Sequence, residues 1–508
     1  MRKLRQKLAL NKVLIAHRGE VALRVQAVCH SRGIATVVVY GPCDRHAAFV
    51  RNADEAYAVS QEGYQAYTDV DALIALAYKV GADAVHPGYG FLSEKADAAQ
   101  KVVDAGLTWI GPNPRVIALM ADKIAARDCM RTAGVPVVPG IVITDFSPEG
   151  LETAHGHVGT LGFPVMVKDP YGGGGKAMQC VWQEHDFKNM VKAVHTQAAR
   201  FTGSSAVLVE KCIERSRHVE VQIAGDGRHC VHLFERECSV QRRHQKIIEE
   251  TPCTFVPAAV LERMYQATLC AAQSVAYDSI GTVEFIVTPD NEFYFLEMNA
   301  RLQVEHAITE MVTGIDLVAL QLALASGEAL ILQQNEIHRR GHAIECRIYA
   351  EDPASNFVPS TGVVTYCQMP SQPFTRTDHD VYQGAIITPF FDPMIAKCIS
   401  WGATRSEAIA RMHTLLQAVM ISGITTNRDF LRAVITSQDF AQGSLHTQRA
   451  EEADFVHRML AGSEISQEEE FLAGLAVMLM LHERERNFYA SGENGCGAVR
   501  GWKEQLWR

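Results

Sequence analysis

The sequence contains no apolar run of the roughly 20 residues that a membrane-spanning helix needs. The longest candidate, Phe471–Leu481, is about half that length and is predicted as a buried helix. The 13 cysteines include no C-x-x-C pair, and no secretory signal is recognised. Free thiols in a reducing compartment, the cytoplasm, are therefore expected instead of disulfides or a zinc site. Positive charge is also scarce, with 48 Lys and Arg against 58 Asp and Glu. This balance excludes a generally basic nucleic-acid-binding surface, although a local cationic pocket is compatible with it.

The composition is that of an ordinary globular protein, with 47% hydrophobic and 21% charged residues. At about 150 residues per domain, 508 residues predict about three domains. Four basic residues lie near the N-terminus: Arg2, Lys3, Arg5 and Lys7. They are compatible with a short targeting sequence, but Lys12 interrupts the apolar part that follows. A basic leader strand or helix is the favoured interpretation.

The first ~120 residues alternate short aliphatic runs with amphipathic stretches. The runs predict strands at Val13–Ala16, Ala35–Tyr40, Asp83–His86 and Leu107–Ile110. Helical spacing predicts helices at Glu20–His30 and Ala72–Val80. Apolar strands separated by helices predict an α/β fold with a parallel sheet covered on both faces. Nucleotide-type ligands favour the carboxyl ends of such strands, where the motifs HRGE and HPGYG lie.

Four consecutive glycines follow a predicted strand that ends in Lys168: Gly172, Gly173, Gly174 and Gly175. Glycines let the backbone approach a phosphate and present its N–H groups. The segment is not a Walker loop, because Ala177 follows Lys176 where Ser or Thr is required. Alone, the glycines would indicate a mobile loop. The lysine on each side favours a phosphate-binding segment.

Paired carboxylates come next. Two strand-like segments, VEFIV and FYFLEMN, are separated by turn residues and predict a hairpin that places Glu284 beside Glu297. Two carboxylates on a rigid sheet suit magnesium, with Asn299 nearby. The alternative is two surface glutamates on an exposed strand face. Because Glu297 lies in an otherwise aromatic and aliphatic run, we favour the metal site.

Arg301, Gln303 and Glu305 alternate directly after this hairpin, and His306 follows. On an extended chain, residues two apart share a face. A guanidinium, an amide and a carboxylate on one face can hold a small planar oxyanion and remove its proton. Exposure is the alternative, because a polar face is costly to bury unpaired.

A basic run lies within Glu237–Glu250 and contains Gln241, Arg242, Arg243, His244 and Lys246. Such a run is usually a solvated face. Beside a phosphate-handling segment in an acidic chain, it indicates a local cationic pocket. Arg347 lies on an alternating strand of the following region, and its position alone indicates little.

These motifs together resemble the biotin carboxylase component of biotin-dependent carboxylases, a branch of the ATP-grasp enzymes. They occur in family order across roughly Lys12 to His446. The stretches that carry the resemblance are IAHRGEVALR, HPGYGFLSE, GGGGK, RHVEVQ, ERECSVQRRHQKIIEE, EFYFLEMNARLQVEH and GHAIECRIYAEDP. Seven motifs in order are much more specific than any one of them.

The resemblance implies a role for each matching residue. It implies ATP contacts at Lys123, Lys168, the four glycines and His218, with Glu210 and Lys211 at the adenine hinge. It implies that Gln241, His244 and Lys246 line the phosphate and bicarbonate side, and that Glu284, Glu297 and Asn299 form the magnesium or manganese site. It implies bicarbonate binding by Arg301, Gln303 and the backbone of Val304, with Glu305 as general base. Arg347 would stabilise the enolate form of biotin, and Tyr89 would border the biotin pocket.

The resemblance also implies the chemistry and the architecture. ATP would convert bicarbonate to carboxyphosphate, which yields the carbon dioxide that carboxylates biotin. The domains would be a doubly wound N-terminal domain over residues 1–121, an ATP-grasp domain over 122–333 with a mobile lid at about 140–211, and an α+β C-terminal domain over 334–449. The tail, 450–508, resembles the lead into a subunit-bridging domain.

No AMKM-type biotinylation site and no carboxyltransferase region occur in the sequence. Biotin is therefore expected on a separate carrier protein or domain, with a carboxyltransferase as a further partner and a homodimer as the family's usual assembly. The chain is either a stand-alone subunit or part of a longer polypeptide. Neither membrane nor nucleic acid is an expected partner.

Several positions depart from the family pattern: His17, Ala121, Asp169, Pro170, Tyr171, Ala177 and Ala307. Ala177 matters most, because its Cβ restricts a lid position where the family keeps glycine. None of them replaces a proposed catalytic side chain. Two alternatives therefore stay open beside an active biotin carboxylase: another ATP-grasp ligase, and a catalytically weak ATP-binding regulatory or assembly subunit.

Overall fold

The computed structural model of the protein describes residues 9–172, 178–461 and 478. The chain divides into two compact units, Met1–Met459 and Leu460–Arg508. The predicted basic leader lies outside the described residues, as does the predicted helix Phe471–Leu481 apart from Met478.

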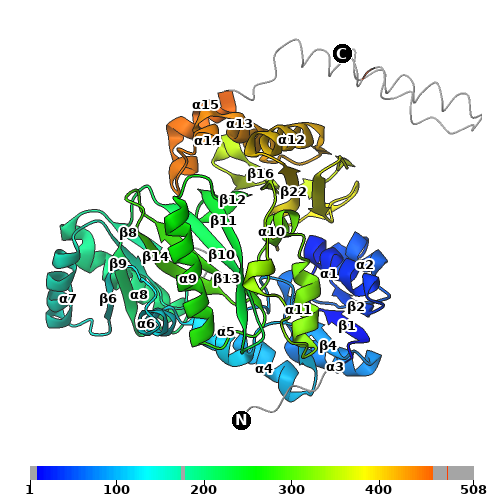
Figure 1. The fold of residues 1–508 in the computed structure, drawn as a ribbon, viewed down its shortest axis with the longest axis horizontal. Helices are drawn as coiled ribbons and strands as arrows, with labels where there is room; N and C mark the ends of the chain where they lie inside the picture. Colours follow the sequence, from blue (N-terminus) through cyan, green and yellow to red (C-terminus); the bar gives the residue numbers. More distant parts are fainter. Residues whose placement is uncertain (1–8, 173–177, 462–477, 479–508) are drawn as a thin grey trace, which may run out of the picture. The chain divides into compact units, whose positions relative to one another are not determined.

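The N-terminal region is a parallel five-stranded sheet in the order β3-β2-β1-β4-β5, coloured blue in Figure 1. Its strands are β1 (Lys12–Ile15), β2 (Ala35–Tyr40), β3 (Glu55–Ala58), β4 (Ala84–His86) and β5 (Thr108–Trp109). Its helices are α1 (Gly19–Ser31), α2 (Ala48–Asn52), α3 (Val70–Val80) and α4 (Ala96–Asp104). The predicted strands and helices are confirmed to within two residues at each end. Strand β3 was missed, because this edge strand is only alternately covered and has no continuous aliphatic run.

Two helices lead into a smaller antiparallel sheet. They are α5 (Pro114–Ala121) and α6 (Lys123–Thr132). The sheet has the order β6-β9-β7-β8, with β6 (Gly140–Ile143), β7 (Val165–Lys168), β8 (Met178–Val181) and β9 (Val207–Lys211). Helices α7 (Pro148–Leu161) and α8 (Phe187–Phe201) pack on it around an aliphatic core of its own that includes Val165, Val191 and Val209.

The largest sheet has eight strands in the order β14-β13-β10-β11-β12-β15-β22-β20, all antiparallel. Their bounds are β10 (Arg217–Gly225), β11 (Cys230–Arg242), β12 (Gln245–Thr251), β13 (Ile280–Val287), β14 (Phe293–Asn299), β15 (His342–Tyr349), β20 (Thr375–His379) and β22 (Met394–Gly402). Because β12 pairs with β15, this sheet runs through the predicted boundary at 333/334 without a break.

The remaining elements are helices and short strands, among which α12, α13 and α14 lie together at the top of the view in Figure 1. The helices are α9 (Ala258–Ser274), α10 (His306–Thr313), α11 (Leu317–Ala325), α12 (Arg405–Ala418), α13 (Arg428–Thr436), α14 (Gln438–Ala441) and α15 (Ala453–Ala461). The short strands are β16 (Glu351–Asp352), β17 (Val358–Pro359), β18 (Gly362–Val363), β19 (Tyr366–Gln368), β21 (Ile386–Ile387) and β23 (Met420–Ser422). Within the described residues, none of the helices taken singly is long and apolar enough to cross a membrane. Helices α10 and α11 reach that length and composition only as a pair bent by 100°.

Candidate active site

The predicted hairpin is formed by β13 and β14, and its register places Glu284 directly opposite Glu297. Oε1 of Glu284 accepts hydrogen bonds from Nδ2 of Asn299 at 2.8 Å and from Nε2 of Gln303 at 3.1 Å. Burial raises the pKa of Glu297, and the charge of Glu284 raises it further. A divalent cation would relieve this repulsion, and carboxylate oxygens are the ligands that Mg²⁺ takes. The pair therefore fits a magnesium or manganese ion.

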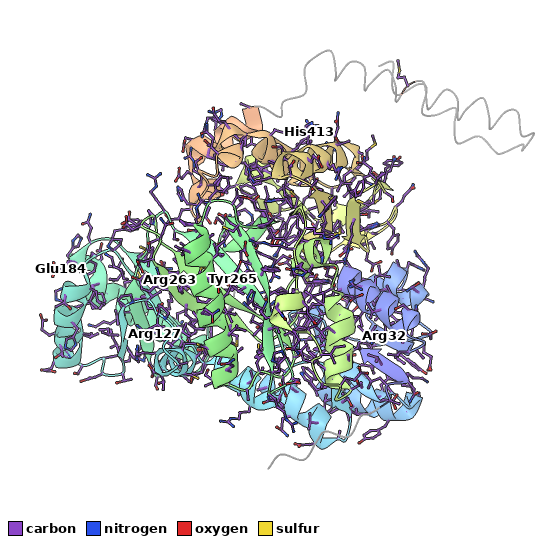
Figure 2. The ribbon with its side chains drawn as sticks, in the orientation of Figure 1. Arg32, Arg127, Glu184, Arg263, Tyr265 and His413 are labelled. Carbon is purple, nitrogen blue, oxygen red and sulfur yellow. The ribbon has the colours of Figure 1, made fainter. Side chains whose placement is uncertain are left out.

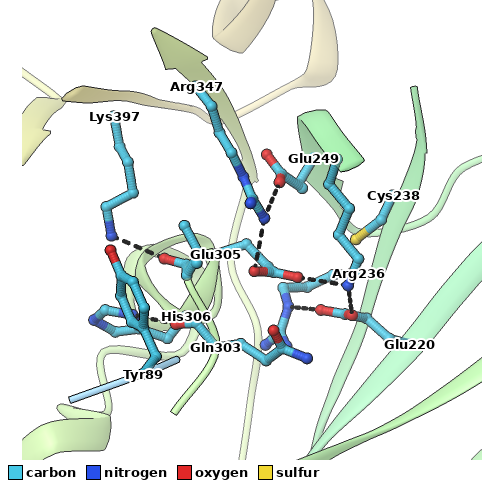
Figure 3. Close-up of polar contacts among 12 residues, drawn as sticks. Tyr89, Glu220, Arg236, Cys238, Glu249, Gln303, Glu305, His306, Arg347 and Lys397 are labelled. Carbon is cyan, nitrogen blue, oxygen red and sulfur yellow. Dashed lines mark hydrogen bonds and ion pairs between the residues drawn. The ribbon is translucent and has the colours of Figure 1, made fainter. Parts of the chain in front are cut away.

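Lys246, on β12, is surrounded by three buried carboxylates, of which Glu220 and Glu305 are labelled in Figure 3. Its Nζ lies 2.8 Å from Oε1 of Glu284 and 2.7 Å from Oε1 of Glu305, and it also donates to Glu220. Burial lowers the pKa of a lysine, but these carboxylates outweigh it and raise the pKa of Lys246 well above its usual value. Glu220, which the sequence analysis left without a role, also accepts from Arg236. Lys246 is thus a fixed positive charge between the carboxylate hairpin and Glu305.

Arg301–Glu305 is not the extended segment that its alternation suggested. It forms a bend and a turn, and Glu305 immediately precedes helix α10. Strand β14 ends at Asn299 on the edge of the sheet, so the chain leaves the strand direction there. Arg301 and Gln303 still meet, with 2.9 Å between Nη1 and Oε1. Side-chain reach, not strand geometry, brings this pair together.

Glu305 lies between two cations. Its second carboxylate oxygen, Oε2, is 2.9 Å from Nη2 of Arg347 on β15, opposite the contact with Lys246. Burial alone would raise the pKa of Glu305, but the surrounding positive charges hold it well below its usual value. The side chain is therefore ionised at neutral pH and can accept a proton. Arg347 also lies 2.6 Å from Glu249, a fully buried residue whose pKa burial raises to about 7.

Arg301 is held by both the hairpin and the N-terminal region. Its Nη2 donates to Oδ1 of Asn299 at 2.9 Å, and its Nε lies 3.1 Å from Oε2 of Glu94, in the HPGYGFLSE motif. Two motifs more than 200 residues apart in the sequence therefore meet at one guanidinium. The alternating pattern had identified Arg301 and Gln303 as site residues. It did not predict the contact between Arg301 and Glu94.

The first group of predicted nucleotide residues lies on the small sheet and on α6. Nζ of Lys168 is 2.7 Å from Oε2 of Glu210, and Arg127, labelled in Figure 2, lies 3.4 Å from the same carboxylate. Lys123, the first residue of α6, donates to the carbonyl of Gly172. Gly173, Gly174 and Gly175 lie outside the described residues.

Lys211 and His244, also predicted to contact the nucleotide, have other surroundings. Nζ of Lys211 donates to the carbonyls of Gly162 and Phe163 at 3.0 Å each, so its ammonium binds the loop between α7 and β7. His244 is exposed in the two-residue turn between β11 and β12, where its φ is +61°.

His218 and Gln241 come together. Nε2 of Gln241 donates to Nδ1 of His218 at 2.7 Å, and Nε2 of His218 lies 3.0 Å from Oε2 of Glu284. The predicted nucleotide residues on β10 and β11 are thus linked to the carboxylate hairpin. With Glu220, His218 and Glu284 offer ligand atoms within 4.8 Å of one another.

Tyr89 and Val304, which were predicted to lie on the substrate side, both form hydrogen bonds with other residues. The hydroxyl of Tyr89 donates to Glu20 on α1, and the carbonyl of Val304 accepts from Nζ of Lys397 at 2.8 Å. Glu20 and Lys397 were not singled out from the sequence.

Two of the unusual residues before the glycines make specific contacts. The hydroxyl of Tyr171 donates to Oδ2 of Asp122 at 2.9 Å, and Asp169 accepts from Thr202 at 2.8 Å. Ala177, the departure with most bearing on the lid, lies outside the described residues.

Comparison with known proteins identifies the family of the chain. Three family models match in order: biotin carboxylase N-terminal domain over 9–117, carbamoyl-phosphate synthase L chain ATP-binding domain over 122–333, and biotin carboxylase C-terminal domain over 345–452. Biotin carboxylase 2 of Bacillus subtilis is 45% identical over 438 residues, which are 86% of this chain and 98% of that protein. The alpha subunit of mitochondrial methylcrotonoyl-CoA carboxylase from Rattus norvegicus is 41% identical over 483 residues, 94% of this chain and 66% of that subunit.

Solved structures show the same likeness. The biotin carboxylase domain dimer of Hydrogenobacter thermophilus 2-oxoglutarate carboxylase, in complex with MgADP, ADP and bicarbonate, has a TM-score of 0.85 and 37% identity, covering 91% of this chain and all of that one. Biotin carboxylase from Campylobacter jejuni has a TM-score of 0.83 and 37% identity, covering 87% of this chain and 98% of that one. From these family models, relatives and structures, this chain belongs to the biotin carboxylase family of ATP-grasp enzymes.

Proposed function

We propose that this chain carboxylates biotin with bicarbonate at the expense of ATP, as the first half-reaction of a biotin-dependent carboxylase. The biotin is carried by a separate protein or domain. The observation that carries the proposal is the position of Glu305. This carboxylate is ionised and buried between Lys246 and Arg347, beside the facing carboxylates of Glu284 and Glu297.

Bicarbonate binds in this proposal against Arg301, Gln303 and the backbone N–H of Val304. Glu305 accepts the bicarbonate proton at a carboxylate oxygen, which makes the remaining oxyanion nucleophilic toward the γ-phosphorus of ATP. Arg301 supports this role because Asn299, Gln303 and Glu94 fix its guanidinium. A guanidinium held in this way is preorganised for an anion.

ATP contacts in this proposal come from the small sheet, from α6, from strands β10 and β11 and from the turn after β11. The nucleotide is contacted by the segment Gly172, Gly173, Gly174 and Gly175 and by five side chains: Lys123, Lys168, His218, Gln241 and His244. Glu210 and Lys211 form the adenine hinge. Glu284 and Glu297, with Asn299 supporting, would hold a divalent cation, which would supply charge neutralisation at the phosphates. Lys246 offsets charge on the bicarbonate side of the transferred phosphoryl group.

Biotin enters beside Tyr89. Carboxyphosphate breaks down to carbon dioxide and phosphate, and this phosphate accepts the proton of the ureido nitrogen. Arg347 offsets the negative charge that develops on the ureido oxygen, and the deprotonated nitrogen attacks carbon dioxide. The contact between Arg347 and Glu305 supports this order of events. While Glu305 is charged it binds the guanidinium, and once Glu305 is protonated the guanidinium is freer to bind a second oxyanion.

The proposal extends to assembly. We propose a biotin carrier protein or domain and a carboxyltransferase as partners, a homodimer as the assembly, and the cytoplasm as the location. The thiols of all cysteines in the described residues are free, as a reducing compartment requires. The proposed domains are 1–121, 122–333 with a lid at 140–211, 334–449, and a tail from 450.

Phosphate release from ATP tests the proposal, measured on the full chain with and without bicarbonate and free biotin. Bicarbonate-dependent release together with carboxybiotin formation is expected. ATP turnover indifferent to bicarbonate would indicate another ATP-grasp ligase. Nucleotide binding without turnover would indicate a regulatory subunit.

A further inference from the structure

Lys397 lies on β22 and is completely buried, although no catalytic proposal uses it. Its Nζ donates to the carbonyl oxygen of Val304 at 2.8 Å. Carboxylate oxygens of Glu20 and Asp378 lie farther away, at 3.5 Å each. A buried ammonium is costly unless its charge and its hydrogen bonds are compensated. Here the carboxylates compensate the charge at a distance, and the hydrogen bond goes to a backbone carbonyl of the proposed bicarbonate site.

A second side chain anchors the preceding peptide. Nδ1 of His306 lies 2.8 Å from the carbonyl oxygen of Gln303, which can only accept, so Nδ1 carries the proton. The C=O and N–H of a trans peptide point in opposite directions in one plane. A fixed Gln303 carbonyl therefore directs the N–H of Val304 the other way, and a fixed Val304 carbonyl does the same for the N–H of Glu305.

Lys397 also reaches the opposite side of the site. Oε2 of Glu20 is the oxygen near Lys397, and Oε1 of the same carboxylate accepts from the hydroxyl of Tyr89. One buried ammonium therefore connects the bicarbonate loop to the tyrosine that we place beside biotin.

The alternative is that Lys397 only neutralises Asp378. However, Arg376 already holds Asp378 through two hydrogen bonds of 2.7 Å, one to each carboxylate oxygen. Asp378 therefore does not need Lys397 as its main partner. The short contact to Val304 and the link to Glu20 are what Lys397 adds.

We propose that Lys397 is a positioning residue that holds the Val304 carbonyl, and with it the turn from Gln303 to Glu305, in place for bicarbonate and, through Glu20, orients Tyr89 for biotin. This inference rests on the proposed function. It predicts that the two small substrates respond to one residue that touches neither of them, while ATP does not.

The test is Lys397→Met in the full chain, with Lys101→Met on α4 as the matched control. Lys101 is half exposed and is paired with Asp71. We expect the KM for bicarbonate to rise roughly 10- to 100-fold in Lys397→Met, because small misplacements of a binding group have effects of that size. The KM for free biotin rises as well, and nucleotide affinity, measured by ADP titration, stays unchanged. Lys101→Met should match the wild type in all three.

Two further variants separate positioning from folding. Glu20→Gln keeps the Val304 contact and weakens the link to Tyr89, so it should raise the KM for biotin and leave that for bicarbonate unchanged. Lys397→Arg keeps the charge and the donors and should restore part of the bicarbonate affinity. If Lys397→Met does not fold, these two variants decide the question.

The outcomes are distinct from failure of the proposed function. If the wild type lacks bicarbonate-dependent ATP cleavage, the proposed function fails first. If the wild type is active but Lys397→Met lowers only kcat and melting temperature with both KM values unchanged, Lys397 is structural and the inference is wrong. A biotin KM unaffected by Glu20→Gln would remove the link to Tyr89.

Discussion

Glu305 shows how single residues in this site depend on their neighbours. It carries a negative charge in a place with no solvent access, because Lys246 binds one oxygen and Arg347 the other. Glu305→Gln preserves size and hydrogen bonding but cannot accept a proton. We expect bicarbonate-dependent ATP cleavage to fall by roughly 10²- to 10⁴-fold, the usual contribution of a general base. Glu292→Gln, at an exposed carboxylate, is the control. Loss of ADP binding in Glu305→Gln would instead indicate a structural role.

Arg347 gives a prediction about the order of steps. Arg347→Met removes the cation proposed to act on biotin, yet Lys246 still contacts Glu305. We therefore expect carboxybiotin formation to fall more than bicarbonate-dependent ATP cleavage, with both measured in the same reaction. Equal losses would mean that Arg347 acts mainly by holding Glu305.

His86 provides a pH prediction outside the catalytic groups. Its Nδ1 accepts from the N–H of Gly88, its Nε2 lies 3.1 Å from Gln321, and burial lowers its pKa to about 3. In the unfolded chain a histidine titrates near 6.5, so between these values the unfolded state binds the extra proton. The stability that neutral His86 contributes is thus present above pH 6.5 and is lost as the pH falls. At pH 5 the loss is about 2 kcal/mol.

Denaturant unfolding of wild type and His86→Gln at pH 8 and pH 5 measures this loss. The advantage of the wild type over the variant should shrink at pH 5. His195→Gln, on helix α8, is the control histidine. An advantage that is independent of pH would show that His86 is not held neutral.

At the scale of elements, local pattern predicted what local geometry controls. The hairpin of β13 and β14 follows from two strand-like segments and a turn, so Glu284 and Glu297 were paired correctly. The segment Arg301–Glu305 alternates equally well but lies beyond the end of edge strand β14, and it turns into α10. The alternating pattern correctly identified the polar side chains of this segment. It did not predict the backbone conformation, because the segment has no neighbouring strand to pair with.

The turn after β4 illustrates a constraint between elements. Gly88 has φ +65°, and a Cβ added there would lie 2.7–2.8 Å from atoms of His17, one of the residues that departs from the family pattern. Gly90 has φ +71° but open space around its Cβ position. Both alanine variants pay the left-handed backbone cost of about 1 kcal/mol.

Gly88→Ala should therefore be less stable than Gly90→Ala by a further ~1–3 kcal/mol, the usual cost of overpacking. Comparison of the two urea midpoints measures the difference directly. Equal midpoints would show that the His17 ring moves away without cost.

At the scale of the whole molecule, the sequence predicted a parallel N-terminal sheet and about three domains, but not how the later strands join. Strand β12 pairs with β15 across more than 90 residues, and Arg347 reaches Glu305 because of that pairing. Nothing in the spacing of either strand indicates its partner. The contacts of Glu20, Glu249 and Lys397 also join residues that are far apart in the sequence, so local spacing did not reveal them.

Glu310 joins three regions of the molecule and gives the prediction that belongs to this scale. From α10, its Oε1 lies 2.8 Å from Nη2 of Arg24 on α1, and its Oε2 lies 2.7 Å from Nη1 of Arg376 on β20. Glu310→Gln removes the carboxylate charge that two partly buried guanidinium groups share. Breaking a buried ion pair costs up to about 3–5 kcal/mol, so a clear fall in melting temperature is expected. Glu292→Gln, which breaks the exposed pair with Arg263 (labelled in Figure 2), should cost below about 1 kcal/mol.

Because Glu310 touches no proposed substrate, its variant should keep the wild-type KM for ATP below its melting temperature. An altered KM for ATP at unchanged stability would mean that Glu310 influences the nucleotide site and does not hold the three regions together.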